Sequence, residues 1–308
     1  MKQAHWFTQS IQVGLMSLAM GAGATFNNST ALAQVTADPS LGTAIIDVIS
    51  PTGTGYGIIG GTTVGGRNLF HSFSRFDVRQ GEGAVFLHAP AIANIFARIT
   101  GNTPSIIDGS IATAILQLPF DPSNRGTANV FLMNPQGIIF GRGAQLNIGG
   151  SFVATTANAI RFPDGAEFSL TSAVEPTNSL LSVNPSAFLF NQIQAAPIIN
   201  RSIANAGRDP SNSFGVFGLR VPDGRSLLMV GGDINTDGGG IVAFGGRIDV
   251  GGVQGSGTVD LNQNGNVLRL QFPENVSRAN VLNRNGSNLI VAADSGGNIA
   301  ITAQNIGY

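Results

Sequence analysis

The residues of this chain that could carry chemistry are few and scattered. His71 and His88 are the only histidines after residue 33, and the chain contains no cysteine. Typical protein metal sites need three or four converging ligands, so this pair predicts no metal site. The spacing Gly55-x-Gly57-x-x-Gly60 matches a dinucleotide-binding loop, but the residues after it do not open a helix, as that motif requires. We expect no metal and no cofactor.

Acidic residues offer one alternative. Asp233, Asp237 and Asp249, with Arg247, could form a carboxylate cluster on one face, as in polysaccharide-cleaving enzymes. Such an enzyme needs two carboxyl groups about 5 to 9.5 Å apart in an open groove. Aspartates that shape turns explain the same residues more simply. Ser151 has no histidine or acid beside it in a nucleophile-elbow setting, so acyl transfer has no support. We expect no catalytic residues and keep a carbohydrate-active enzyme as an alternative.

The elements that position these residues are short strands. Two apolar runs, Val130–Met133 and Ile138–Phe140, flank the four residues Asn134-Pro135-Gln136-Gly137. Pro135 presets the backbone of a corner, and Gly137 can take the positive φ that a tight reversal needs. The segment therefore predicts a strand, a turn and a second strand.

The same pattern of short apolar runs closed by turn residues fills the chain after residue 33. The clearest expected strands are Ile45–Ile49, Gly57–Ile59, Asn68–Phe70, Ala84–Leu87 and Ile111–Leu118. Two segments could be helices. Around Pro90–Arg98 the apolar residues recur at helical spacing, although a strand with its turn fits equally well. Pro185–Gln192 follows Asn184 as a potential helix cap.

Composition favours a solenoid of stacked coils. Only 11% of the residues are charged, whereas globular domains average about 25%. Polarity comes from Asn, Ser, Thr and Gly, and the 15 arginines nearly balance the 17 acids, so charge does not predict a nucleic-acid partner. In a parallel β-helix, inward apolar side chains stack from coil to coil, corners favour Gly, Asn and Asp, and stacked asparagines form ladders.

Internal repetition supports the solenoid. Leu227–Val250 and Asn288–Ile306 each contain an apolar run, a pair of small residues, an acidic turn and a second apolar run. This similarity suggests that the same coil occurs twice. An antiparallel sandwich or barrel is the competing fold, and Asn264-Gly265 and Asn285-Gly286 are the hairpin dipeptides it would use. We expect an all-β chain forming a right-handed parallel β-helix with an N-terminal cap.

The N-terminus resembles a signal peptide. Lys2 and His5 precede the mostly apolar stretch 11–24, and the A-x-A site Ala31-Leu32-Ala33 follows. A membrane anchor is the alternative, but the apolar stretch is shorter than the about 20 residues that span a bilayer. We expect residues 1–33 to be removed after Ala33 during export, which also agrees with the absence of cysteine.

Three ordered motifs carry a resemblance to a known family. They are Asn68-Leu69-Phe70-His71-Ser72-Phe73, the NIxxRxTG-like Asn94–Gly101, and Asn134-Pro135-Gln136-Gly137-Ile138, which a GGSFxATTA-like segment follows. Together they resemble the secretion domain of filamentous haemagglutinin-like exoproteins of the two-partner secretion pathway, in their cyanobacterial type. The third motif usually reads NPNGI in that family, so Gln136 departs from it.

The resemblance implies a secretion domain over residues 34–200 and continuing β-helix coils over 201–308. It implies passage through the periplasm, recognition by an outer-membrane barrel transporter with POTRA domains while the chain is extended, and an adhesin-like protein that is secreted or held at the cell surface. Asn134–Ile138 would serve partner recognition or corner folding. A toxin domain beyond residue 308 is a further alternative, and the surface ligand is unknown.

Overall fold

The computed structural model describes residues 34–50, 53–294 and 296–308, so the expected signal segment and its cleavage site at Ala31 and Ala33 lie outside the described residues. Residues 34–308 form one compact unit. Among the described residues, no helix is long and apolar enough to cross a membrane.

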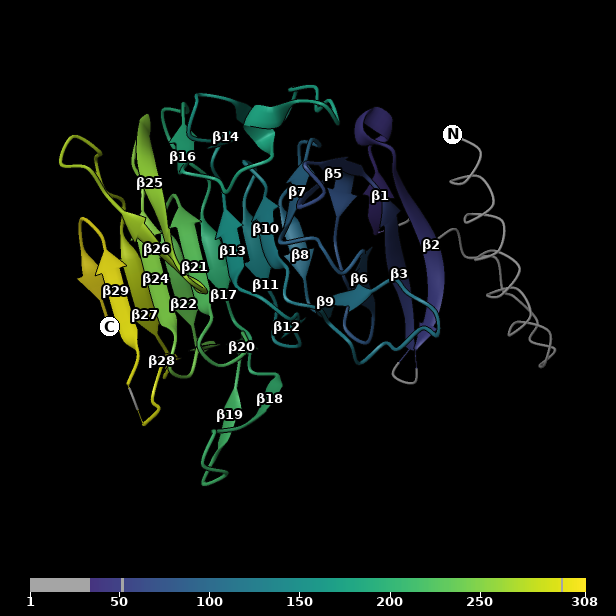
Figure 1. Cartoon of the computed structure of the whole chain (residues 1–308). Coiled ribbons are helices and arrows are strands. Elements are labelled where there is room, and N and C mark those ends of the chain that lie inside the picture. Colours follow the sequence, from purple (N-terminus) through teal and green to yellow (C-terminus); the bar gives the residue numbers. More distant parts are fainter. Residues whose placement is uncertain (1–33, 51–52, 295) are drawn as a thin grey trace, which may run out of the picture. The chain divides into compact units, whose positions relative to one another are not determined.

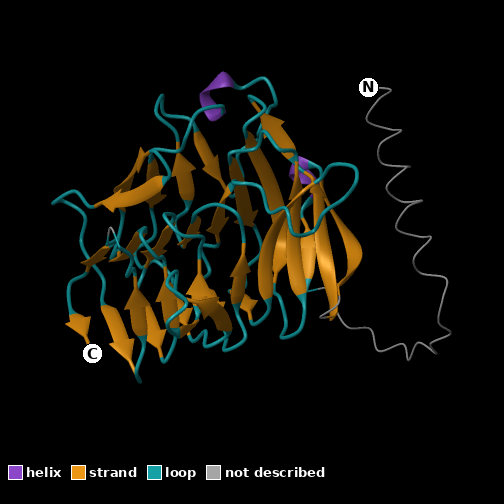
Figure 2. Cartoon of the chain, turned by 60° about the horizontal axis from the view of Figure 1, so that its bottom comes forward, coloured by secondary structure: helices purple, strands orange, loops and turns teal. Residues whose placement is uncertain are grey.

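Three faces of short, mostly parallel strands form a solenoid (Figures 1 and 2). The largest face, sheet A, has the order β1-β5-β7-β10-β13-β21-β24-β29, with β4 beside β5. Its strands are β1 (Val35–Ala37), β4 (Thr62–Val64), β5 (Asn68–Phe76), β7 (Asn94–Ile99), β10 (Asn129–Met133), β13 (Phe152–Thr155), β21 (Ser226–Gly231), β24 (Arg247–Gly252) and β29 (Asn298–Thr302).

The second face, sheet C, has the order β30-β27-β22-β17-β11-β8. Its strands are β8 (Ser105–Ile107), β11 (Ile138–Phe140), β17 (Ile198–Asn200), β22 (Ile234–Asp237), β27 (Val281–Arg284) and β30 (Ile306–Gly307). All of its pairings are parallel.

The third face is divided into two sheets. Sheet B contains β2 (Thr43–Ser50), β3 (Gly53–Gly60), β6 (Gly83–His88), β9 (Ser110–Ile115) and β12 (Gln145–Asn147). Sheet F contains β20 (Leu219–Arg220), β23 (Gly240–Val242) and β28 (Asn288–Ile290). One coil runs from sheet A through sheet C to the third face, as β7, β8 and β9 do, and β10, β11 and β12 repeat that path one level further.

Three insertions leave the coils: two of them together form sheet D, and the third forms sheet E. Sheet D is antiparallel and contains β14 (Ala159–Arg161), β15 (Glu167–Ser169), β16 (Ala187–Phe190), β25 (Gly257–Asn264) and β26 (Val267–Gln271). Sheet E is the hairpin β18 (Asn205–Arg208) and β19 (Gly215–Phe217), which projects from the coils in Figure 1. The part of the chain that the structure describes also contains two short 3-10 helices, η1 (Pro39–Leu41) and η2 (Ser179–Leu181).

Two large hydrophobic cores result from this arrangement, and a third, small cluster consists of Val216, Val242 and Phe244. The first fills the inside of the coils with residues from all three faces, such as Ile95, Ile107 and Ile111. The second lies between the outer surface of sheet A and sheet D, where Phe96 meets Phe168. Strands of sheet A are therefore buried on both sides, and all residues of β7 and β10 are buried.

The expected parallel β-helix is confirmed, and its N-terminal end is closed by β1, which pairs antiparallel to β5. For Pro90–Arg98 the strand alternative is confirmed, and the helix prediction for Pro185–Gln192 is wrong. β7 occupies most of the Pro90–Arg98 segment and β16 lies within Pro185–Gln192. Burial on both faces removes the alternation that normally marks a strand, so the apolar spacing resembled that of a helix.

The expected register of the internal repeat is also wrong. Leu227 lies in sheet A, whereas Asn288 pairs with Gly240 in sheet F. In sheet A, Leu227 pairs with Ile248, and Ile248 pairs with Ile299. Ile299 is therefore the residue of the last coil that corresponds to Leu227. The repeat is real, but its two copies begin at different faces of the coil.

Candidate functional site

The turn Asn134–Gly137 joins β10 to β11, as the sequence predicted. The Gly137 amide donates to the Asn134 carbonyl at 3.0 Å, and the Gln136 amide donates to the Asn134 side-chain oxygen at 2.9 Å. Gly137 has φ of 114°, a conformation that favours glycine, and an added Cβ would lie 3.2 Å from the Pro197 carbonyl oxygen. Local turn chemistry and the next coil together fix this residue as glycine.

Asn134 ties this corner to the preceding coil. Its side-chain nitrogen donates to the Thr103 carbonyl at 3.1 Å and to the Ser105 hydroxyl at 3.0 Å, and the side chain is fully buried. Pro135, Gly137 and Ile138 are buried as well, and Gln136 is half-buried. The folded domain therefore offers a partner little of this motif beyond Gln136.

All six residues Asn68–Phe73 of the first motif are buried in β5. Leu69 and Phe73 belong to the core inside the coils, and the His71 ring lies 5.6 Å from the ring of Phe86 there. Burial, together with the proximity of His88, lowers the pKa of His71 from 6.5 to about 3. His71 is therefore neutral at physiological pH and serves as a core side chain.

Asn68 begins a buried ladder of asparagines across three coils. The Asn94 side chain donates to the side-chain oxygen of Asn68 at 2.9 Å, and Asn129 donates to that of Asn94 at 2.9 Å. The Ser151 amide donates to the Asn129 side-chain oxygen at 2.9 Å. This ladder confirms that asparagines stack in the coils. Phe70, Phe96 and Phe131 stack in a column beside the ladder, and the centroids of neighbouring rings lie 4.8 Å apart.

Arg98, from the NIxxRxTG-like motif, is a buried cation that sequence reasoning did not single out. Only 2% of its surface is exposed. Its guanidinium donates to the Ser72 hydroxyl at 3.0 Å, to the Ser40 hydroxyl at 3.1 Å and to the Ser172 carbonyl at 2.7 Å. Burial lowers its pKa, and nearby Asp38 acts in the opposite direction. The sequence feature that could have indicated this buried cation is a single arginine within an otherwise apolar run.

The carboxylates considered for catalysis do not converge. Asp233 accepts hydrogen bonds from Asn280, and Asp237 pairs with Arg201. Asp249 is buried beneath β26, where it accepts from the Leu270 amide at 2.7 Å and lies 2.7 Å from the Arg247 guanidinium. Each aspartate thus has its own structural partner.

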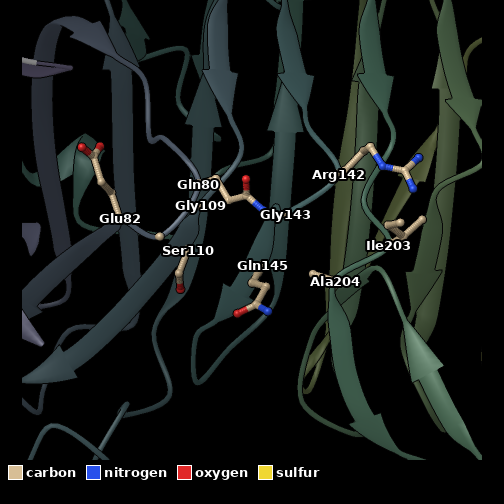
Figure 3. A pocket seen from close by; sticks show the side chains of 10 residues that line it. Gln80, Glu82, Gly109, Ser110, Arg142, Gly143, Gln145, Ile203 and Ala204 are labelled. Carbon is tan, nitrogen blue, oxygen red and sulfur yellow. The ribbon is translucent and has the colours of Figure 1, made fainter. Parts of the chain in front are cut away.

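A groove of about 510 Å³ lies at the junction of sheets B and C. Figure 3 shows Gln80, Ser110 and Gln145 between Glu82 and Arg142, which lie toward its two ends. Glu82 is the single carboxylate among the residues that line it, so it lacks the paired acids of a glycosidase. Among the described residues no cluster of three or more potential metal ligands occurs.

The fold is a parallel β-helix with buried sequence motifs, and comparison with known families gives its class. The model of the TPS secretion domain matches residues 33–301, and the chain belongs to this family. The resemblance noted in the sequence is thereby confirmed, whereas its cyanobacterial type stays a prediction. The family is one of secretion domains and is not known for catalysis. The comparison with curated proteins gives no match.

Two solved structures are similar at low identity. The HMW1 secretion domain from Haemophilus influenzae has 16% identity and a TM-score of 0.47, with 84% of this chain and 60% of that chain covered. The filamentous hemagglutinin secretion domain has 10% identity and a TM-score of 0.33, with 89% of this chain and 99% of that one covered. The chain thus spans 60% of the length of the first structure.

Proposed function

We propose that this chain is a secreted exoprotein that reaches the periplasm through its N-terminal signal segment and leaves through a cognate outer-membrane transporter. Residues 34–200 act as the secretion domain, and residues 201–308 continue the coils. POTRA domains of the transporter are the receiving partner. The mature protein is released or held at the cell surface, where it acts as an adhesin rather than an enzyme. Membership in the TPS secretion domain family supports this proposal.

The burial of the sequence motifs supports an order of events in which recognition precedes folding. Every residue of Asn68–Phe73 is buried, and so are four of the five residues Asn134–Ile138. A transporter cannot contact buried side chains without unfolding the domain around them. Recognition of these motifs therefore takes place before the coils form, and folding afterwards removes the motifs from the transporter. Return of the folded chain is then unfavourable.

Co-expression with and without the transporter tests the pathway. We expect the chain in the medium only when the transporter is present. Equal secretion in both strains would exclude the two-partner route. Asn134→Ala, which removes the side-chain bonds to Thr103 and Ser105, is compared with Gln136→Ala, whose side chain is half-exposed.

Binding to the isolated periplasmic part of the transporter tests the order of events. The wild-type chain kept unfolded in mild urea is expected to bind, and the refolded chain is expected to bind at least tenfold more weakly. Equal binding of the two forms at the same urea concentration would contradict recognition before folding. Asn134→Ala measured in the unfolded form separates recognition from corner folding, because the turn is then absent.

A further inference from the structure

Two buried polar groups on the outer side of sheet A are satisfied by one distant stretch of chain. We call this stretch, residues 169–184, the return segment. It starts at the last residue of β15, contains η2 and leads toward β16. Although it follows β13 in sequence, its contacts are with β5 and β7, at the N-terminal end of the solenoid.

The first group is the guanidinium of Arg98. Its Nη1 atom donates to the carbonyl oxygens of Ser169, at 2.5 Å, and Ser172, at 2.7 Å. The guanidinium carbon also lies 5.0 Å from the centre of the Phe168 ring, just before the return segment. Without these partners the buried guanidinium would keep only two hydrogen-bond acceptors, the hydroxyls of Ser72 and Ser40. Unpaired buried charge is strongly destabilising.

The second group is the first amide of the asparagine ladder. The Asn68 side-chain nitrogen donates to the carbonyl oxygens of Leu181 and Val183, at 2.7 and 2.6 Å. Asn94 adds a bond of 3.2 Å to the side-chain oxygen of Asn184. The end of the ladder therefore depends on residues 113 and 115 positions further along the chain.

Packing adds to these bonds. Leu181 is 1% exposed and belongs to the core between sheets A and D. Gly65, at the turn before β5, approaches the return segment so closely that an added Cβ would collide with the Cβ of Ser182. Gly66, the next residue, also has positive φ but has no atom within 4 Å of an added Cβ.

We propose that the return segment is a closing device for the N-terminal coils: strands β5 and β7 become stable only when residues 169–184 have docked on them. Both strands are complete by residue 99, yet the side-chain nitrogen of Asn68 and the Nη1 atom of Arg98 lack their acceptors until the chain has extended through residues 169–183. If the proposed export route holds, the motifs on β5 and β7 stay accessible to the transporter until the return segment has also been exported. The folding step itself does not depend on that route.

Hydrogen exchange during refolding of the purified full chain tests the order without any transporter. Amides of β5 and β7 are expected to gain protection together with those of η2, with rates that agree within about twofold. Protection of β5 and β7 at least tenfold faster than that of η2 would overturn the proposal, because the coils would then close without the return segment.

Native-state exchange of Gly65→Ala and Gly66→Ala provides a matched pair. Both substitutions place alanine at positive φ, but only Gly65→Ala forces the return segment away. We expect Gly65→Ala to accelerate hydrogen exchange of η2, β5 and β7 by the same factor. This factor should be at least ten times the acceleration that Gly66→Ala causes in the same elements. Faster exchange of η2 alone, or equal effects of the two variants, would refute the proposal. If Gly65→Ala fails to fold, the wild-type refolding order decides.

Discussion

Replacement of Asn94 by alanine measures how much the buried asparagine ladder stabilises the domain. Asn94 is 1% exposed and its side chain bonds to Asn68, Asn129 and Asn184, with distances of 2.9, 2.9 and 3.2 Å. Alanine removes all three bonds and leaves the partner groups of Asn68 and Asn129 buried without a partner. Each such buried orphan costs about 1 to 3 kcal/mol, so we expect these two to lower the free energy of unfolding by about 2 to 6 kcal/mol.

An exposed ladder in the same molecule supplies the control. Asn305 donates to the side-chain oxygen of Asn280 at 2.9 Å, with the same chemistry but in contact with water. Water replaces a lost partner there, so Asn305→Ala is expected to cost about 0.5 kcal/mol or less.

Urea unfolding followed by circular dichroism gives both free energies. The loss for Asn94→Ala is expected to be at least about fourfold that for Asn305→Ala. A loss below about 1 kcal/mol for Asn94→Ala, or equal losses for the two variants, would show that burial does not set the strength of the ladder. An unchanged dependence of the free energy on urea is required for the comparison, because a change would indicate a different unfolded state.

Three further predictions concern the core, the signature turn and pH. Phe96→Ala removes the central ring of the column between Phe70 and Phe131 and should lower the free energy of unfolding by about 3 to 5 kcal/mol in urea titrations. Gly137→Ala, at φ of 114°, should cost about 1 to 3 kcal/mol in the same assay, and a neutral result would contradict the need for glycine there. Because burial lowers the pKa of His71 from 6.5 to about 3, the unfolded state binds the extra proton between these pH values, so stability is full above pH 6.5 and falls as the pH drops toward 3. Each pH unit within this window costs up to about 1.4 kcal/mol; His71→Phe should flatten this dependence between pH 6.5 and 4, and an unchanged slope would show that another group is responsible.

The coil architecture could be predicted because its physical causes are local. The turn at Asn134–Gly137 follows from its own residues, and the stacking of asparagines follows from their number and their preference for corners. The dipeptide Asn264-Gly265 did mark a real hairpin, between β25 and β26, but this hairpin belongs to the sheet that covers the coils. A correct local signal therefore gave no information about the surrounding fold.

The contacts of Arg98 and of the return segment could not be predicted in the same way. The acceptors at Ser169, Leu181 and Val183 are backbone carbonyls, which every residue type possesses. No pattern of side chains distinguishes them in the sequence. The placement of a long insertion depends on tertiary packing, and the same packing buries both sides of β7 and hides its strand character.

Sheet D has a mechanical consequence for the solenoid. Bare coils stretched from one end are loaded in series, so they detach one after another at low force. The hairpin β25–β26 bonds through its backbone to three successive coils, at Ser151 directly before β13, at Ser226 in β21 and at Asp249 in β24. We therefore expect these coils to share an applied load through the crossing hairpin and to rupture together.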